Sequence, residues 1–301
     1  MKICYGLMAS SKQEQVDNLI QLLHVSDNQI VIIVDKKSED LFQFLYNKYK
    51  DTENIYFILD RFDVYWGGIT TTTATLSLMK NTLNLDYDYF TMVSESCLPL
   101  YPDSEIKAFL ERHKGQEFID VRFDWTKRSR LHLDHSKPYT AWQRKHRNLM
   151  AFRDVMVDTL FGWTVGKNKQ FKSWKVPTTL LWFTISKELV GYLVKTIEDN
   201  NLIEKYSKTL IADEHIWAEV IYNSPYYDKL LLKNKRGGAL LYCDWYTIKA
   251  PKLLTMKDYD KIYNYKYPCL YARKFDLATE PEVVLKIYEN RKNPDFKCKY
   301  K

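Results

Sequence analysis

Residues 3–34, ICYGLMASSKQEQVDNLIQLLHVSDNQIVIIV, decide the fold class of this chain. Apolar, partly β-branched runs from Ile3 to Met8 and from Ile30 to Val34 predict two strands. Between them, apolar residues recur at the spacing of a helix face: Val16, Leu19, Ile20 and Leu23. A strand, a helix and a second strand of this length form a β-α-β unit, which indicates a parallel sheet in an α/β fold.

Strand and helix patterns keep alternating after this unit. We expect strands at 55–59, 89–93, 180–185 and 240–243, and helices at 39–48, after the threonine run 70–73, and at 187–198, 213–222 and 281–290. Residues 122–175 are rich in Trp, Arg, Lys and His and predict helix and irregular loop rather than sheet. No repeat, low-complexity tract or Gly/Ser linker interrupts the chain, so we predict one compact domain over residues 1–301.

The composition favours an anionic partner. The 301 residues carry a formal net charge of +7, which suits nucleotide diphosphates, acidic glycans, phospholipid surfaces or nucleic acid. Apart from a cluster between Lys127 and Arg147 and a short basic tail, Lys and Arg are spread along the chain, so we expect no nucleic-acid partner. The 23 Tyr and 8 Trp suit stacking on sugars or nucleobases, although a biased genome would explain them equally well.

The cysteines and the apolar runs indicate a cytoplasmic protein. Five widely separated cysteines without a CxxC pair argue against a disulfide framework or a zinc site: Cys4, Cys97, Cys243, Cys269 and Cys298. The sequence begins in a strand pattern without the core of a signal peptide, and no apolar run approaches the roughly 18 residues of a membrane span. We therefore expect any membrane contact to be peripheral, at the inner face of the cell membrane.

Two segments carry the most chemistry. In Ile211-Ala212-Asp213-Glu214-His215-Ile216-Trp217, Asp213 is a candidate helix cap, and Glu214 shares a helix face with Trp217, at a spacing that points the carboxylate toward the core or a cleft. In Tyr271-Ala272-Arg273-Lys274-Phe275-Asp276, a basic pair stands beside aromatic residues. A proton acceptor and a cationic clamp are what a metal-free enzyme needs to move a sugar off a nucleotide diphosphate.

Two further places allow a binding role or a purely structural one. Asp35 follows a predicted parallel strand, where an acid often accepts hydrogen bonds from a ribose or base, but it could equally cap the next helix. In Trp66-Gly67-Gly68, the glycines permit either a close approach of the backbone to a ligand or a tight turn with a packed Trp. Spacing does not separate these alternatives.

The metal and nucleotide motifs of other enzyme classes find no support. Two Asp-Tyr-Asp triplets, 86–88 and 258–260, imitate a metal motif, but their positions predict a turn before a strand and a helix cap. His132 and His135 flank Asp134 without further ligands at useful spacing, so we expect a solvated or acceptor-facing loop. G-x-S-x-G, Walker and G-x-G-x-x-G patterns do not occur.

Taken in order, eight segments resemble the core-2/I-branching glycosyltransferase family, which is glycosyltransferase family 14 and includes peptide O-xylosyltransferases. The matching segments are Tyr5-Gly6-Leu7-Met8-Ala9, Val34-Asp35-Lys36-Lys37-Ser38, Trp66-Gly67-Gly68, the run from Tyr89 to Leu100, Leu181-Trp182-Phe183, Asp213 to Trp217, Asp244-Trp245, and Tyr271 to Asp276. The resemblance implies a GT-A-like, Rossmann-type nucleotide-binding fold with a mostly parallel central sheet flanked by helices. It also implies that residues 1–121 form the nucleotide-sugar-binding half and residues 122–301 the acceptor-binding and catalytic half.

The resemblance also implies roles for individual residues. Glu214 resembles the general base, Asp35 the uridine contact, and Lys274 the cation that binds the diphosphate. We place a second diphosphate cation at Lys249, with Lys252 and Arg273 as rivals. The remaining expected donor contacts are Ala9, Ser94 and Glu95, and the expected acceptor contacts are Trp245, Trp66, Gly67, Gly68, Asp120 and Trp182.

The expected reaction is inverting transfer from a UDP-sugar. N-acetylglucosamine is the expected sugar, and the alternative is either xylose or a hexose other than N-acetylglucosamine. No cofactor or divalent metal is expected. Ser10-Ser11 and Thr179-Leu180-Leu181-Trp182 depart from the family pattern, and the cysteines do not follow its lumenal members. These departures favour a bacterial surface-polysaccharide enzyme acting on a glycan or lipid-linked glycan. The competing class is a non-catalytic binder of an anionic polysaccharide, membrane or RNA.

Overall fold

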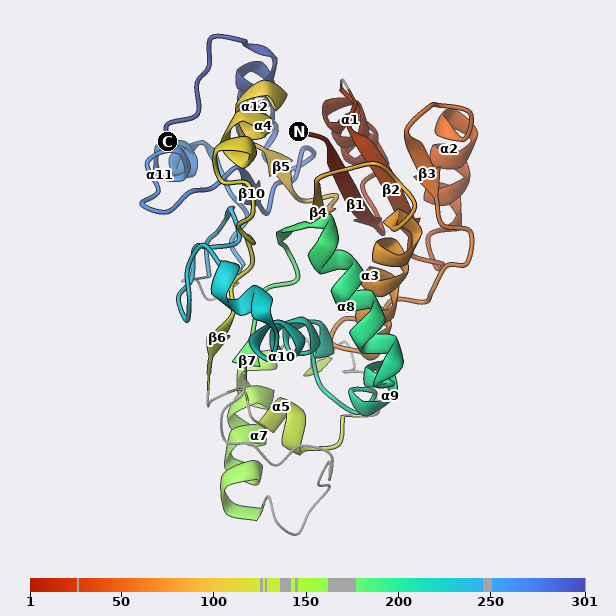
Figure 1. Cartoon of the computed structure of the whole chain (residues 1–301), viewed down its shortest axis with the longest axis vertical. Coiled ribbons are helices and arrows are strands. Elements are labelled where there is room, and N and C mark those ends of the chain that lie inside the picture. Colours follow the sequence, from red (N-terminus) through yellow and green to blue (C-terminus); the bar gives the residue numbers. More distant parts are fainter. Residues whose placement is uncertain are drawn as a thin grey trace.

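A five-stranded sheet forms the centre of the fold, in the order β3-β2-β1-β4-β8 (Figure 1). The computed structural model describes residues 1–25, 27–124, 127, 129–135, 142–143, 146–161, 177–245 and 251–300, with the backbone alone at Arg147 and Phe161. The strands are β1 (Ile3–Ala9), β2 (Gln29–Val34), β3 (Ile55–Phe57), β4 (Tyr89–Ser94) and β8 (Thr184–Ser186). The first four run parallel and β8 is antiparallel to β4. The predicted α/β class with a mostly parallel sheet is confirmed.

Helices cover both faces of this sheet because its strands are apolar on both faces. One core lies under α1 (Gln13–Leu23), α2 (Glu39–Tyr49), α4 (Asp103–Arg112) and α12 (Pro281–Lys292). The other lies under α3 (Ile69–Thr82), α8 (Lys187–Asp199), α9 (Leu202–Lys205) and α10 (Ile216–Tyr222). Strand β1 alternates between them, since Tyr5 packs into the first core and Cys4 into the second.

Gly6 lets β1 and β4 pack closely. A Cβ atom at this position would lie 2.3 Å from Cζ of Phe90, which is a buried ring on the neighbouring strand. Residue 6 therefore has to be glycine for Phe90 to fill the second core.

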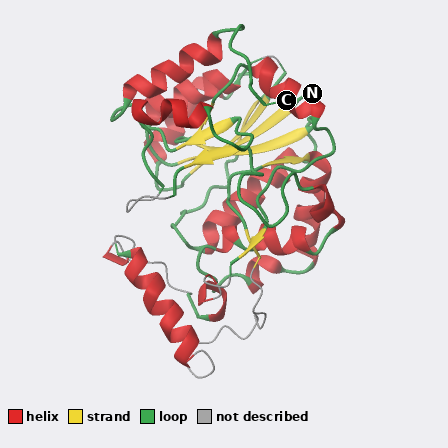
Figure 2. Ribbon diagram, turned by 90° about the vertical axis from the view of Figure 1, so that its left-hand side faces the viewer, coloured by secondary structure: helices red, strands yellow, loops and turns green. Residues whose placement is uncertain are grey.

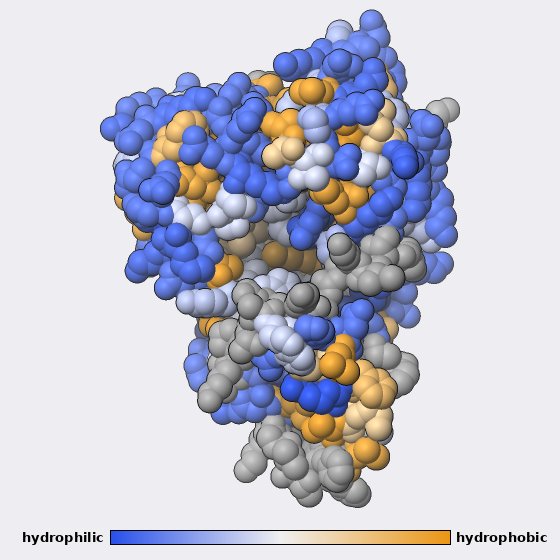
Figure 3. Space-filling view, turned by 180° about the vertical axis from the view of Figure 1, so that it is seen from behind, coloured by the Kyte–Doolittle hydropathy of each residue, from blue (hydrophilic) through white to orange (hydrophobic). Residues whose placement is uncertain are grey.

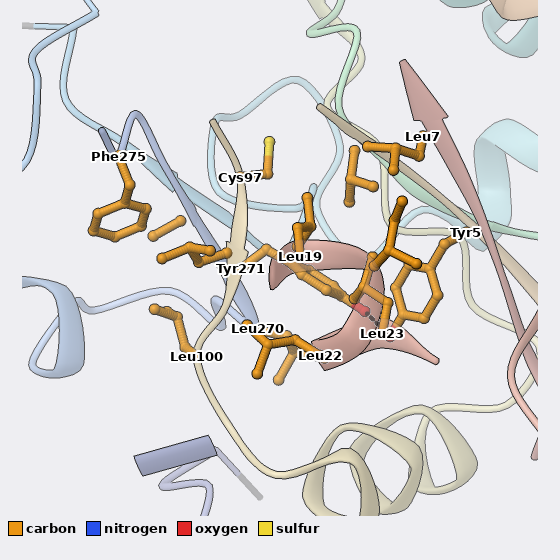
Figure 4. Packing of buried hydrophobic residues seen from close by; sticks show 14 of the residues in the cluster. Tyr5, Leu7, Leu19, Leu22, Leu23, Cys97, Leu100, Leu270, Tyr271 and Phe275 are labelled. Atoms are coloured by element: carbon orange, nitrogen blue, oxygen red, sulfur yellow. Dashed lines mark hydrogen bonds between the residues drawn. The ribbon is translucent and has the colours of Figure 1, made fainter. Parts of the chain in front are cut away.

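A three-stranded sheet lies against the first core and carries the predicted basic pair. It contains β5 (Leu98–Pro99), β10 (Tyr271–Arg273) and β9 (Leu241–Cys243), with β10 in the middle. Figure 4 shows Tyr271 beside Tyr5, whose hydroxyl oxygen lies 3.2 Å from that of Tyr271. This pair ties β10 to β1 and so fixes where Arg273 and Lys274 emerge.

The far end of the molecule is built on a small two-stranded sheet of β6 (Arg122–Phe123) and β7 (Pro177–Thr178). Helices α5 (Ser129–His132) and α7 (Arg147–Phe161) pack together there. Figures 1 and 2 place α7 at the opposite end of the molecule from the five-stranded sheet. Short elements complete the described chain: the 3₁₀ helices η2 (Ala212–Glu214), η3 (Pro225–Lys229) and η4 (Met256–Asp258), and helix α11 (Tyr259–Tyr263).

Four expected elements differ from the observed ones. The strand expected at 180–185 is limited to Thr184–Ser186, and the helix expected after residues 70–73 begins at Ile69, so the threonine run lies inside it. The helix expected at 213–222 begins at Ile216 instead, because Ile211 adopts a left-handed conformation with φ 56° and the chain continues as one 3₁₀ turn. Residues 122–175, expected without sheet, contribute β6 to a strand pair.

Among the described residues, none of the helices combines the length and the apolar character that crossing a membrane requires.

Candidate active site

A cavity of about 1040 Å³ lies at the carboxyl ends of β1, β2 and β4. Its wall on that side consists of Met8, Ala9, Ser10, Asp35, Ser94, Glu95 and Ser96. Open α/β sheets bind their ligands at this edge, and small-molecule sites usually measure about 300–1,000 Å³. The cavity is therefore the candidate active site.

Asp35 stands at the end of β2 and is almost fully buried. Its carboxylate accepts hydrogen bonds from the backbone N–H of Lys37 at 3.0 Å and from that of Val64 at 3.4 Å. The ammonium of Lys37 lies 2.9 Å from both carboxylate oxygens. Asp35 thus holds the loop after β2 and also lines the cavity. A ribose or base bound there would hydrogen-bond to a carboxylate that already pairs with Lys37.

Glu95 and Ser94 follow β4 on the same wall. Glu95 Oε1 accepts hydrogen bonds from the hydroxyls of Ser10 at 3.1 Å and Ser11 at 3.4 Å, the two residues that depart from the family pattern. Ser94 is buried beside Cys97 and lines the cavity with Ala9.

Gln15 connects this wall to the strand that carries the basic pair. Its buried amide donates to the carbonyl oxygens of Glu95 and Phe275, and its Oε1 accepts from the backbone N–H of Leu277. One side chain of α1 therefore holds the segments after β4 and β10 together.

Arg273 and Lys274 enter the cavity from the end of β10. The guanidinium carbon of Arg273 lies 4.1 Å from the ring centre of Trp182, which also lines the cavity. Burial, with the nearby charge of Arg273, lowers the pKa of Lys274. Burial and the charge of Arg273 both disfavour the charged form of Lys274. A bound anion would offset both effects.

Of the three candidates for the second diphosphate cation, Arg273 lines the cavity. Lys252 does not line the cavity in the part of the chain that the structure describes, and its ammonium lies 2.5 Å from Asp258 Oδ1. Asp258 also accepts from Thr255 as part of a capping box, which confirms the cap predicted for that triplet. Lys249 lies outside the described residues.

Gly67 positions the segment that carries the acidic pair. Its φ of +79° favours glycine, and a Cβ atom there would lie 3.1 Å from Cδ1 of Leu210. Its carbonyl oxygen accepts from the backbone N–H of Ile211 at 2.8 Å. Trp66 and Gly67 line the cavity, whereas Gly68 is the residue that precedes α3 and does not.

Glu214 is held by two cations that the sequence did not indicate. Lys127 Nζ and Arg130 Nη1 each lie 2.7 Å from Oε2 of Glu214, and all three residues line the cavity. Burial alone would raise the pKa of Glu214, but Arg130 and Lys127 outweigh burial and hold it well below its usual range. Glu214 is therefore ionised, and its partner Lys127 has its pKa lowered by burial.

The two residues that flank Glu214 in the chain have pKa values shifted so that their uncharged forms are favoured. Burial, together with the charge of Glu214, raises the pKa of Asp213 to about 7. Burial and the charge of Arg130 lower the pKa of His215 to about 3, so this ring is neutral. His215 Nδ1 donates to the carbonyl oxygen of Pro177 at 3.0 Å, which anchors the acidic segment on β7. Asp213 lies inside η2, and the N-cap position of α10 is occupied by His215, so the predicted capping role of Asp213 is wrong.

Of the remaining expected acceptor contacts, Trp245 lines the cavity and Asp120 does not. The buried carboxylate of Asp120 accepts from the backbone N–H groups of Gly238 at 2.7 Å and Gly237 at 3.3 Å. These bonds fix the loop that brings Arg236 to the cavity, so Asp120 acts on the site through that loop.

The family of the chain that forms this cavity follows from a comparison with known protein families. The family model described as "Core-2/I-Branching enzyme" matches residues 3–265. This chain belongs to that family.

Known members and structures resemble the chain to different degrees. Xylosyltransferase 1 of Rattus norvegicus is 22% identical over 94% of this chain and 35% of its own length, and xylosyltransferase oxt of Drosophila melanogaster is 25% identical over 91% and 32%. This family member therefore spans about a third of the length of the curated relatives that it matches. A crystal structure of mouse xyloside xylosyltransferase 1 in its apo form covers 90% of this chain and is itself covered to 97%, with a TM-score of 0.39 and 11% identity.

For this Core-2/I-branching family member, most residues chosen from the sequence come together. Glu214, Asp35, Lys274, Arg273, Ala9, Ser94, Glu95, Trp245, Trp66, Gly67 and Trp182 line one cavity. The sequence did not single out Lys127, Arg130, Arg122, Arg236 or Gln15. The basic cluster beginning at Lys127 was visible, but nothing in its spacing links it to an acid 84 residues away.

Metal ligands do not gather in the described chain. No group of three or more His, Cys, Asp or Glu there could hold a metal ion. His132 Nδ1 instead lies 3.1 Å from Asp158 Oδ1 on α7. The predicted solvated or acceptor-facing loop is wrong at His132, because this residue belongs to α5 and does not line the cavity.

Proposed function

We propose that this chain is an inverting glycosyltransferase that moves a sugar from a UDP-sugar to a hydroxyl group of a glycan acceptor. The observation that carries the proposal is that an ionised carboxylate, Glu214, and the pair Arg273-Lys274 line one cavity at the nucleotide-binding edge of the sheet. Membership of the Core-2/I-branching family supports the same reaction.

In the proposed step, the acceptor oxygen attacks the anomeric carbon from the face opposite UDP while Glu214 accepts the hydroxyl proton. A carbon–oxygen bond forms to the acceptor, and the bond from the anomeric carbon to the diphosphate oxygen breaks. UDP leaves with that electron pair, and the configuration inverts. Lys127 and Arg130 keep Glu214 ionised until the acceptor arrives and then supply donors to the acceptor's oxygens.

The leaving diphosphate gains negative charge, which Lys274 and Arg273 are placed to stabilise. The stack of Arg273 on Trp182 presets the direction of the guanidinium, which lowers the entropic cost of binding a phosphate. We propose that these side chains take the place of a divalent metal. Asp35 is the proposed uridine contact.

The donor sugar under this proposal is N-acetylglucosamine, with xylose or a different hexose as the alternative. N-acetylglucosamine is the sugar that the resemblance implied. Xylose gains support because the curated relatives are xylosyltransferases.

The setting that we propose is the synthesis of a surface polysaccharide of bacterial type at the inner face of the cell membrane. All five cysteines are free thiols in the structure, which suits a reducing compartment. The proposed acceptor is a glycan or a lipid-linked glycan.

The test is UDP release from a panel of UDP-sugars, with monosaccharide and disaccharide acceptors and with EDTA present. We expect acceptor-dependent release with UDP-N-acetylglucosamine or UDP-xylose, and NMR of the product should show a β linkage from the α donor. Absence of release with every pair would overturn the transferase assignment. Release that requires added Mg²⁺ or Mn²⁺ would overturn the metal-free step alone.

A further inference from the structure

Helix α7 buries polar residues and exposes apolar ones. Asp154 and Asp158 are buried, and Asp158 pairs with His132 of α5. Large apolar side chains are exposed at the spacing of one helix face: Leu149, Phe152, Met156 and Leu160. Of these, Phe152 also borders the cavity. A soluble helix normally has the opposite arrangement, so this face is built to contact something other than water.

The exposed face continues beyond the helix. Trp142, which is also exposed, contacts the ring of His146 just before α7, with 4.4 Å between the ring centres and 30° between the ring planes. Figure 3 shows apolar residues gathered on the lower part of the molecule, where α7 lies in Figures 1 and 2. We call Trp142, Leu149, Phe152, Met156 and Leu160 the α7 face.

Charge identifies the partner of the α7 face. Residues 122–175 contain 13 Lys and Arg against 4 Asp and no Glu, whereas the whole chain has a net charge of +7. The rest of the chain is therefore slightly acidic, and the positive charge is concentrated in the segment that contains α7. Arg122, Lys127 and Arg130 of this segment line the cavity, whereas Arg153 lies on α7 and is half-exposed. An apolar helix face with an exposed Trp, in a segment of net positive charge, suits an anionic lipid surface.

We propose that the α7 face docks this protein on an anionic membrane surface, with α7 lying in the plane of the headgroups. Asn148, Ala151, Phe152 and Val155 of the same helix line the cavity, so docking would bring the cavity to the lipid surface. That consequence rests on the proposed function and favours a lipid-linked acceptor; the docking itself does not depend on any reaction.

The experiment is co-sedimentation with vesicles of phosphatidylcholine, with and without phosphatidylglycerol. The protein should sediment with the anionic vesicles only, and high salt should release it. The double variant Met156→Gln/Leu160→Gln should lower the partition about tenfold, because two side chains that enter the lipid become polar. The matched control is Leu285→Gln on α12, since Leu285 is 52% exposed and Leu160 53%.

Neither Met156 nor Leu160 lines the cavity, so the double variant should keep its UDP release with a soluble acceptor. Failure of UDP release in the wild type would count against the proposed function and leave the docking result standing. The docking proposal is overturned if wild-type protein ignores anionic vesicles or if the double variant and Leu285→Gln bind alike. It is also overturned if the wild type forms a dimer that the double variant abolishes and neither binds vesicles, because a second copy then covers the α7 face.

Discussion

Arg130 donates from Nη1 to Oε2 of Glu214 over 2.7 Å, although the two residues are 84 positions apart in the chain. Lys127 donates to the same oxygen, so both of these cations engage Oε2 of the carboxylate. Together with the cation pair at the end of β10, this contact determines how the site is charged before substrates bind.

Replacement of Glu214 by Gln should lower transfer about 100-fold or more while UDP still binds, because the amide cannot accept the hydroxyl proton. It should also destabilise the fold by about 3 kcal/mol above pH 4.5, since Lys127 and Arg130 lose their counter-charge. Turnover, UDP calorimetry and urea unfolding measure the three effects. Glu219→Gln on α10 is the control, because Glu219 bonds Lys205 and does not line the cavity. Near-normal turnover in Glu214→Gln would remove Glu214 from the mechanism.

Replacement of Lys127 by Met should move the acid limb of the kcat/KM profile to higher pH. Lys127 lowers the pKa of Glu214, so its loss raises that pKa, and the base becomes protonated at a pH where the wild type is still ionised. Lys208→Met is the control, since Lys208 pairs with Asp134 away from the cavity. An acid limb that stays in place would mean that Glu214 is not the titrating base.

Asp213→Asn should stabilise the protein at neutral and higher pH. Burial and Glu214 raise the pKa of Asp213 from 3.8 to about 7, so the folded state holds a proton that the unfolded state has lost between these values. The contribution of Asp213 to the free energy of unfolding therefore falls as pH rises from 3.8 through 7, by roughly 4 kcal/mol in total. Asn does not ionise, so the variant does not lose this stability as the pH rises. Urea unfolding at pH 5 and above pH 7 should show a gap that widens with pH, and a constant gap would contradict the shift.

Lys274→Ala should weaken UDP binding by about 10- to 100-fold, the usual effect of removing one charged donor from a phosphate. Lys252→Ala should leave it unchanged, because the Lys252 ammonium is engaged by Asp258 and does not line the cavity. Calorimetry with UDP compares the two variants. The reverse order would assign the diphosphate contact to Lys252.

Local patterns were enough for the sheet and for most of its helices. Strand β1 is a run whose side chains alternate between two cores, and α1 shows a regular apolar face, so each could be recognised without its neighbours. The short resemblance segments also drew attention to Glu214 and Lys274, which line the same cavity in the structure. The helix predicted from residue 213 begins only at Ile216. A hydrogen bond to Gly67, far away in sequence, holds Ile211 in a left-handed conformation just before it.

By itself, the sequence determined the α/β class and the parallel strands, and it singled out Glu214 and the pair Arg273-Lys274 as candidates, because these depend on periodicity and residue type within short windows. Only the tertiary structure decided which charges meet. Lys127 and Arg130 pair with Glu214. Asp120 accepts a hydrogen bond from the backbone of Gly238 and does not line the cavity. Helix α7 exposes apolar side chains. Electrostatic and packing energies depend on distances in space, and the spacing of residues along the chain does not specify those distances.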